Sequence, residues 1–189
     1  MAERASMAAQ IDLVERLVGD TANSRFSREE MQTALDVYRL EARYEPLTGM
    51  TTYAPGGAAV VVTFAADAGY WETDAALFDG TYTPLTPAAA DWTAGRWTFA
   101  AEPVAPVTIL GWNHDPYQAA ADLLEVRAAQ LAEQYDFSTG PDSFRRSQRQ
   151  GQLLAMAARY RAMSPRVKAA ADAAADWTMP EITVDVFQF

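Results

Sequence analysis

The sequence contains no cysteine among its 189 residues, which excludes disulfide bonds, thiolate metal sites and cysteine nucleophiles. No uninterrupted apolar run approaches the ~20 residues that a membrane-spanning helix needs. Charged residues also interrupt the N-terminal segment where a signal peptide would be apolar, so we expect a soluble chain of intracellular origin. Basic residues are scarce: 15 against 25 acidic residues give a formal net charge of −10, which argues against general nucleic-acid binding.

Sequence motifs for catalysis or cofactor binding are missing as well. The chain has no GxxxxGKS/T or GxGxxG phosphate-binding motif, no HExxH motif and no EF-hand loop. The single histidine, His114, precedes Asp115, but no nucleophile motif accompanies this pair. A structural or surface role for His114 is therefore favoured over a catalytic dyad, and we expect no catalytic residue, no metal and no cofactor.

Two helices are expected within the first 44 residues. Apolar residues recur at helical spacing until Gly19, where the first helix is predicted to end. The second helix begins with a predicted capping box of Ser27 and Glu30, which Phe26 and Met31 flank as a hydrophobic staple. The apolar faces of the two helices consist of Met7, Ile11, Val14 and Val18, and of Met31, Leu35, Tyr38 and Ala42.

Residues 45–112 differ in character and predict an inserted β module. They are rich in threonine, valine and aromatic residues, and the turn sequences PGG, DAG, DG and TAG interrupt them. Half of all residues are apolar, which makes a packed core feasible. The predicted strands are 48–54, 58–65, 71–78, 81–86, 96–101 and 106–112, enough for a small antiparallel sandwich or barrel.

Acidic and aromatic residues occur together in the β module. The acidic residues are Asp67, Glu72, Asp74, Asp79 and Asp91, and the aromatic residues are Tyr70, Trp71, Tyr82, Trp92 and Trp97. Exposed aromatic rings would suit carbohydrate binding, and a suitably spaced pair of carboxylates would suit glycoside hydrolysis. The favoured interpretation is structural, with the rings in the core and the acids in turns.

Helical patterning returns after the β module. Pro116 lies in a first-turn position after Asp115, a candidate cap, and an apolar stripe follows: Tyr117, Ala120, Leu124, Ala128, Leu131 and Tyr135. A short loop, FSTGPD, leads into a basic helix. In this helix Phe144, Gly151, Leu154, Ala157 and Ala158 are expected to pack inward, with Leu153 and Tyr160 beside them. The predicted fold class is α+β: a bundle of about four helices (1–44 and 113–164), the inserted β module (45–112), and an extended C-terminal arm (165–189).

Basic residues are concentrated between Ser143 and Lys168, where no acidic residue occurs. Nucleic-acid contact and a solvated face are two interpretations, but the first lacks interleaved aromatic residues and the second leaves like charges close together. A contact with the acidic helix 115–136 or the acidic β module of a neighbouring copy explains the concentration of basic residues best. A heterologous contact of that kind repeats around a ring. The candidate subunit-interface residues are Arg145, Arg146, Arg149, Arg159 and Arg161.

The C-terminal segment shows strand periodicity after an Ala/Asp-rich spacer. It either closes the β module as a further strand or forms an arm donated to another protein, and the spacer favours the arm. The candidate docking residues of this arm are Trp177, Ile182, Val184, Val186, Phe187 and Phe189.

The segment YQAAADLLEVRAAQLAEQYDFSTGPDSFRRSQRQGQLLAMAARYR resembles the helical core of tailed-bacteriophage head–tail connector proteins, also called adaptor or head-completion proteins. In that family an Ala-rich helix with a Leu-Leu pair, here Leu123 and Leu124, is followed by a short polar loop. The next helix begins with an element similar to Ser143, Phe144, Arg146 and Ser147 of this chain. The resemblance covers 115–163 well and 5–44 loosely, and the β module departs from the smallest, all-helical members.

This resemblance implies a non-enzymatic virion protein that is made in the host cytoplasm and located at the head–tail neck. It implies a homo-oligomeric ring, dodecameric in this family, that binds the portal protein above and a neck or tail protein below. Genomic DNA would pass through the lumen without sequence-specific binding, and an acidic lumen would let it slide. No membrane is involved. The alternative is a carbohydrate-binding β module on a helical base, which requires Trp71, Trp92 or Trp97 to be exposed.

Overall fold

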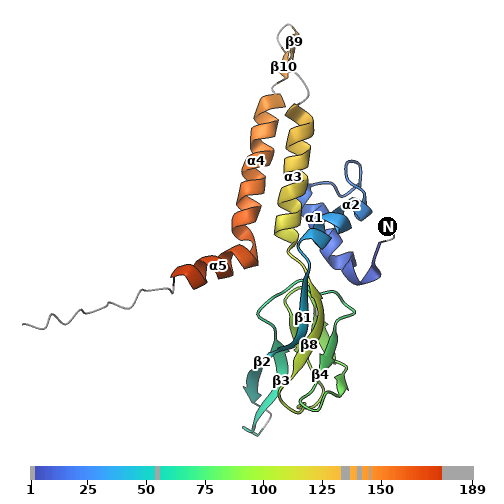
Figure 1. Cartoon of the computed structure of the whole chain (residues 1–189), viewed down its shortest axis with the longest axis vertical. Helices are drawn as coiled ribbons and strands as arrows, with labels where there is room; N and C mark the ends of the chain where they lie inside the picture. Colours follow the sequence, from blue (N-terminus) through green and yellow to red (C-terminus); the bar gives the residue numbers. More distant parts are fainter. Residues whose placement is uncertain (1–2, 54–55, 133–136, 140–141, 145, 176–189) are drawn as a thin grey trace, which may run out of the picture.

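The chain folds into a helical region and a β region that lie end to end (Figure 1). The computed structural model describes residues 3–53, 56–132, 137–139, 142–144 and 146–175. Its helices are η1 (Ala5–Met7), α1 (Ala8–Val18), α2 (Arg28–Val37), α3 (Pro116–Ala132), α4 (Arg146–Met163) and α5 (Pro165–Ala175). Its strands are β1 (Leu40–Pro46), β2 (Thr48–Tyr53), β3 (Ala59–Ala65), β4 (Ala76–Phe78), β5 (Pro84–Leu85), β6 (Ala89–Asp91), β7 (Arg96–Thr98), β8 (Thr108–Asn113), β9 (Phe137–Thr139) and β10 (Asp142–Phe144).

The local signals that the sequence carries for α1 and α2 are confirmed. Gly19 ends α1 with a φ of 66°, a left-handed conformation that glycine adopts without steric cost. Ser27 and Glu30 form the predicted capping box, in which the Ser27 N–H donates to Glu30 Oε2 at 2.7 Å and the Glu30 N–H donates to Ser27 Oγ at 3.2 Å. Phe26 and Met31 are both buried.

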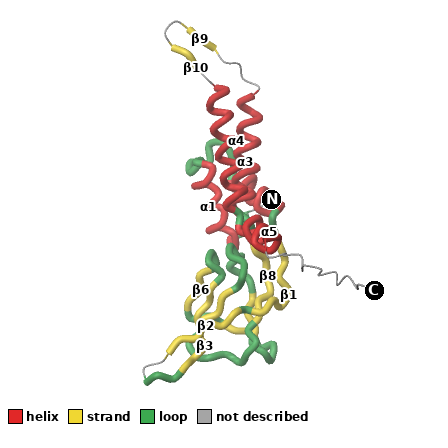
Figure 2. Tube along the Cα trace, turned by 90° about the vertical axis from the view of Figure 1, so that its left-hand side faces the viewer, coloured by secondary structure: helices red, strands yellow, loops and turns green. Residues whose placement is uncertain are grey.

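The helices share one apolar core around α3. α1, α2 and α4 all pack against α3, and α4 lies beside it along its length (Figures 1 and 2). The predicted stripe of α3 is confirmed at Ala120, Leu124 and Ala128, which are fully or almost fully buried. Burial of a leucine side chain contributes about 1.5–3 kcal/mol to stability. No residue of α5 belongs to this core, so its stabilisation comes from the other helices. None of the described helices combines the length and apolar content that a bilayer span requires.

The inward face of α4 differs by one position from the prediction. Leu153 and Ala157 are buried and Tyr160 packs against the core, whereas Leu154 is 44% exposed. Gly151 and Ala158 are exposed as well. The observed spacing of four and three residues places one narrow stripe on α3, because alanine-rich helices approach closely along few positions.

The β region contains two four-stranded antiparallel sheets, so the fold is mixed α and β as predicted. Their strand orders are β1-β8-β4-β5 and β2-β3-β7-β6. Side chains from both sheets form a second apolar core, in which Phe64, Trp71, Trp97 and Ile109 are buried. Neither sheet closes into a barrel.

Strand β1 corrects the expected end of the second helix. That helix was expected to continue through Ala42, but α2 ends at Val37 and β1 begins at Leu40. β1 pairs with β8 from Leu40↔Asn113 to Pro46↔Thr108, and Ala42 is buried in the core of the β region rather than among the helices. The pairing overrides the helical propensity of LEARYEP, because it buries Ala42 and satisfies the backbone of β8.

Three further segments differ from the predictions. Only Ala76–Phe78 of the predicted strand 71–78 is a strand, and Trp71 makes an isolated bridge to Asn113. Strands β9 and β10 pair as a hairpin where a plain loop was expected. Residues 165–175 form helix α5 instead of an extended segment, because alanine is the strongest helix former. The predicted arm residues from Trp177 to Phe189 lie outside the described residues.

Candidate functional site

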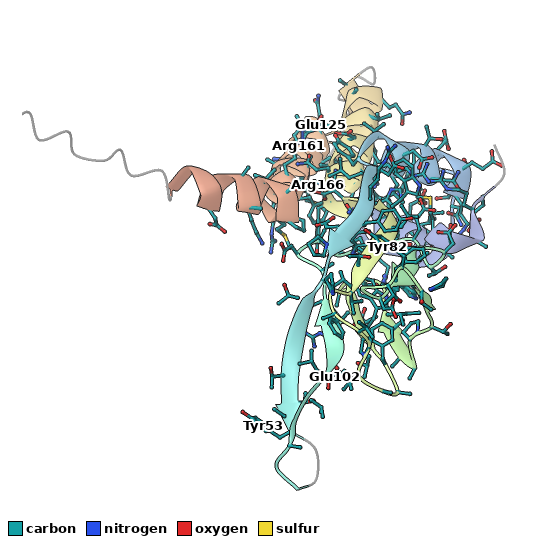
Figure 3. All side chains as sticks on the ribbon, turned by 60° about the horizontal axis from the view of Figure 1, so that its bottom comes forward. Tyr53, Tyr82, Glu102, Glu125, Arg161 and Arg166 are labelled. Atoms are coloured by element: carbon teal, nitrogen blue, oxygen red, sulfur yellow. The ribbon has the colours of Figure 1, made fainter. Side chains whose placement is uncertain are left out.

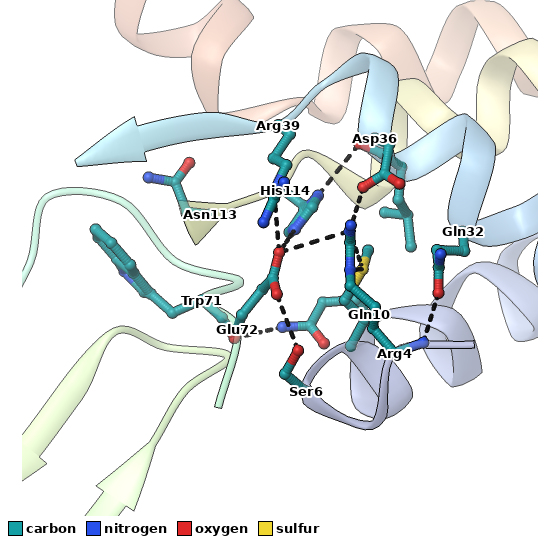
Figure 4. A network of polar contacts seen from close by, with 12 residues as sticks. Arg4, Ser6, Gln10, Gln32, Asp36, Arg39, Trp71, Glu72, Asn113 and His114 are labelled. Carbon is teal, nitrogen blue, oxygen red and sulfur yellow. Dashed lines mark hydrogen bonds and ion pairs between the residues drawn. The ribbon is translucent and has the colours of Figure 1, made fainter. Parts of the chain in front are cut away.

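A polar cluster around a buried carboxylate, which we call the polar junction, connects the helical region to the β region. It consists of Arg4, Ser6, Arg39, Glu72 and His114 (Figure 4). Glu72 lies at its centre and is 1% exposed. Its carboxylate accepts hydrogen bonds from His114 Nε2 at 2.9 Å, Ser6 Oγ at 2.9 Å and Arg39 Nε at 3.1 Å, and Arg4 lies at 3.6 Å. Ser6 belongs to η1, Arg39 lies between α2 and β1, and His114 follows β8. Three segments that are distant in the sequence therefore meet on one carboxylate.

The environment of Glu72 keeps this buried carboxyl group ionised. Burial by itself would raise its pKa, because a charge is poorly solvated inside a protein. The hydrogen bonds from His114 and Ser6, together with the charges of Arg4 and Arg39, outweigh burial and lower the pKa of Glu72 to about 2. The Arg39 guanidinium also lies over the Trp112 ring, 3.8 Å from its centroid, which fixes it beside the carboxylate.

His114 has a structural role, as its sequence context favoured. Nε2 faces Glu72, and Nδ1 lies 3.2 Å from the backbone oxygen of Leu35. Both partners are oxygen acceptors, so the position of the proton on the imidazole ring decides which of the two bonds His114 donates. It contacts Glu72 instead of pairing with Asp115, and the imagined His114–Asp115 dyad is not formed.

Asp115 joins two helices beside the junction. Its Oδ1 accepts from the N–H groups of Tyr117 and Gln118 at 3.1 and 3.2 Å, which confirms it as the cap of α3. Its Oδ2 accepts from the hydroxyl of Ser164, a fully buried residue between α4 and α5. Arg166 of α5 donates to Asn113 Oδ1 at 3.0 Å, so the base of α5 is fixed to the end of β8.

The five candidate interface arginines are not equivalent. Arg149 and Arg159 are exposed on α4 and form no ion pair with any described residue. Arg161 lies at 2.8 Å from both Asp122 and Glu125 of α3 in the same chain (Figure 3). Its charge is thus compensated internally. Arg145 lies outside the described residues, and Arg146 is the first residue of α4, with its side chain also outside them.

The aromatic residues of the β region are mainly core residues. Trp71 and Trp97 are fully buried, with ring centroids 6.1 Å apart, and Trp92 is half-buried at 5.5 Å from Trp97. The exposure that carbohydrate binding would require is therefore missing at Trp71 and Trp97. Asp79 and Asp91 accept hydrogen bonds within their own turns, as predicted. Glu72 also begins a turn, since its backbone oxygen accepts from the Ala75 N–H at 3.2 Å, but its carboxylate belongs to the polar junction.

Sequence reasoning did not identify Glu72 as a central residue. Its partner His114 lies 42 positions away in the chain, and no local pattern connects the two. Among the described residues, no group of three or more histidine or acidic side chains is arranged to hold a metal ion.

Two surface hollows also lie in the helical region or next to it. One, of about 230 Å³, is lined by residues that include Gln10, Asp12, Arg16 and Tyr70. Gln10 is 2% exposed; its Nε2 donates to the Trp71 carbonyl, and its Oε1 has no hydrogen-bond partner in the described part of the chain. The other hollow, of about 160 Å³, is lined by Arg25, Arg127, Gln130, Leu131 and Arg149.

Comparison with known proteins adds no relative. No family model matches the chain, and the searches of curated proteins and of solved structures gave no match either.

Proposed function

We propose that the chain is a non-enzymatic structural protein of a phage virion, a head–tail adaptor. Copies of it form a ring beneath the portal, extend the DNA channel and join the head to the tail. In this proposal the helices up to Val37 and from Pro116 to Met163 are the helical bundle of the adaptor, the strands from Leu40 to Asn113 are the inserted β module, and 165–189 are the arm. The similarity of 115–163 to connector proteins supports this assignment, and the α3–α4 pair lies in that segment.

The observation that carries the proposal is an uncompensated separation of charge. Arg149 and Arg159 are exposed on α4 without an ionic partner among the described residues. The exposed acidic residues of the β region, which also lack an ionic partner there, are Asp67, Asp74, Asp91 and Glu102. Figure 1 shows α4 in the upper part of the molecule and the β region in the lower part. Opposite charges on different faces of one chain favour contacts between copies, in which one face meets a different face of the next.

The interface of the proposal involves fewer residues than the sequence alone indicates. Arg161 is paired with Asp122 and Glu125, so its charge contributes to the packing of α4 on α3. Arg149 and Arg159 are thus the described residues best suited to contact a neighbouring copy. An exposed pair across such a contact contributes only about 0–1 kcal/mol, so several repeated pairs around the ring are needed.

Ring formation is tested by native mass spectrometry of the chain alone and with the portal of the same phage. We expect a large closed oligomer in at least one condition, and we expect Arg149→Glu combined with Arg159→Glu to abolish it. The matched control is Arg43→Glu combined with Arg96→Glu, because both residues are exposed on the β region and the charge change is the same. Rings of normal size from the α4 variant would contradict the interface, and a chain that stays monomeric with the portal would contradict the adaptor itself.

The arm is tested separately. Its base is ordered, because Arg166 contacts Asn113 and Ser164 contacts Asp115. Deletion of residues 177–189 should abolish retention by immobilised portal, while the circular dichroism spectrum keeps its helical signal. Unchanged retention of the truncated chain would show that the arm does not dock on the portal.

A further inference from the structure

Three arginines from three separate segments line the smaller hollow, which we call the arginine pocket. Arg25 comes from the loop between α1 and α2, Arg127 from α3 and Arg149 from α4. Gln130 adds an amide group, and Leu131 adds apolar surface. The pocket has a volume of about 160 Å³. This is enough for a small polyatomic ion and less than the 300 Å³ or more that is typical of sites for larger organic ligands.

Buried contacts hold two of these arginines in place. Asp20, 3% exposed, accepts hydrogen bonds from the backbone N–H groups of Ser24, Arg25 and Phe26 at 2.8–3.0 Å and from the Ser24 hydroxyl at 2.7 Å. The loop that presents Arg25 is therefore fixed. Arg127 is half-buried, and its Nη1 donates to the Val18 backbone oxygen at the end of α1 at 3.4 Å.

The positive charges of the arginine pocket are not neutralised by the described part of the chain. None of the three arginines forms an ion pair with a described residue, and no carboxylate lines the pocket. Burial lowers the pKa of Arg127, and so do the charges of Arg25 and Arg149, whereas Asp20 gives a smaller opposing contribution. The Asp20 carboxylate is already occupied by the loop. Three guanidinium groups are thus held close together at an energetic cost that an anion would remove.

We propose that the arginine pocket binds a tetrahedral oxyanion with two negative charges, such as inorganic phosphate or the terminal group of a phosphate monoester. Guanidinium groups donate paired, planar hydrogen bonds that fit the oxygens of a phosphate. A single carboxylate, with one charge and two oxygens, would leave more of the three positive charges uncompensated. A terminal phosphate carries about −1.5 to −2 charges at pH 7 and offers three acceptor oxygens, one for each arginine.

The site is tested with inorganic phosphate as the probe. Thermal unfolding of the full chain is followed in sodium phosphate, sodium sulfate and sodium chloride at the same ionic strength, and phosphate affinity is measured by isothermal titration calorimetry. A ligand that binds only the folded chain raises the midpoint of unfolding as its concentration rises. A nucleoside monophosphate is the second arm, and it distinguishes free phosphate from the end of a larger molecule.

Arg149→Gln is the main variant, because Arg149 is exposed and contributes no contact to the apolar core. It should weaken phosphate binding about tenfold or more, as expected for the loss of a charge-assisted hydrogen bond. Arg25→Gln should act in the same way. The control is Arg159→Gln, which removes the same charge from the same helix outside the pocket.

The effect of phosphate on the two arginine variants distinguishes a specific oxyanion site from a general ionic effect. Saturable stabilisation by phosphate that is lost in Arg149→Gln and kept in Arg159→Gln supports it. Equal effects of phosphate and chloride, or equal phosphate binding by both variants, would overturn it. If a glutamate-rich peptide binds through Arg149 while phosphate and sulfate do not, the pocket accepts protein carboxylates and the oxyanion assignment is wrong. Arg149 and Arg159 are also candidate interface residues, whereas Arg25 is not, so the loss of phosphate binding in Arg25→Gln tests the pocket separately from ring formation.

Discussion

Replacing Glu72 with glutamine removes the carboxylate at the centre of the polar junction while it keeps the shape of the side chain. His114 then lies in a buried position without its carboxylate partner, and Arg39 loses its closest carboxylate. Removal of one partner from a buried ionic cluster costs about 3–5 kcal/mol, because the charge that is left behind is poorly solvated. We therefore expect Glu72→Gln to lower the free energy of unfolding by about 3 kcal/mol at pH 7.

The pKa of Glu72 gives an independent value for this effect. Folding lowers the pKa from 4.5 to about 2. At about 1.4 kcal/mol for each pKa unit, the ionised carboxylate contributes about 3 kcal/mol at pH 7. Because the pKa of the folded state is the lower one, this stabilisation is complete above the unfolded value of 4.5 and is lost as the pH falls toward 2. At pH 3 about 1.4 kcal/mol of it remains.

The measurement is urea denaturation of the native chain and of Glu72→Gln at pH 7, 5 and 3. The difference between the two free energies of unfolding should be about 3 kcal/mol at pH 7 and about half of that at pH 3. Comparing differences removes the contribution of other acidic residues, such as Asp20, that titrate in both chains. Glu102→Gln is the control, because Glu102 is exposed on the β region and its substitution should stay within about 0.5 kcal/mol (Figure 3). A difference below 1 kcal/mol at pH 7, or one that does not change with pH, would refute the reasoning.

Three further predictions concern the helical core, the cap of α3 and a glycine of the β region. Leu124→Ala should cost about 2–5 kcal/mol in chemical denaturation because Leu124 is fully buried, whereas Leu154→Ala on the facing helix, 44% exposed, should cost less than about 0.5 kcal/mol. Asp115→Ala removes the cap of α3 and should lower the free energy of unfolding by about 1–2 kcal/mol; an unchanged midpoint would contradict that role. Gly95→Ala places a Cβ against a backbone oxygen at a φ of 65° and should cost at least about 2 kcal/mol, against about 1 kcal/mol for Gly19→Ala, where nothing lies within 4 Å. A similar decrease in the free energy of unfolding for the two glycine variants would mean that the backbone around Gly95 shifts to make room for the Cβ.

The parts of the fold that the sequence predicts are those that local interactions determine. The capping box of Ser27 and Glu30 spans four residues, and the left-handed end of α1 needs only Gly19, so both are readable without knowledge of the partners. Strand β1 is the opposite case. LEARYEP contains good helix formers, and only β8, whose paired residues lie 62–73 positions further along, imposes the extended conformation.

The same distinction applies to the candidate sites. The sequence identifies the basic character of α4, because its arginines are close together in the chain. It does not show that Arg161 is paired with α3, nor that Arg149 meets Arg25 and Arg127, since these partners are brought together only by folding. The central position of Glu72 in the polar junction is not readable from the sequence for the same reason.

The attachment of the β region through two adjacent strands has a mechanical consequence. β1 follows α2, β8 precedes α3, and the two strands pair from Leu40↔Asn113 onward. The backbone therefore enters and leaves the β region at the same end. A tensile force between the helices and the β region is therefore shared by two covalent backbones in parallel. It draws both strands in one direction and does not slide one past the other, so the ladder between them is spared shear. The hydrogen bonds that Glu72 accepts from His114 and Arg39, the residues next to these two strands, oppose tilting of the β region against the helices.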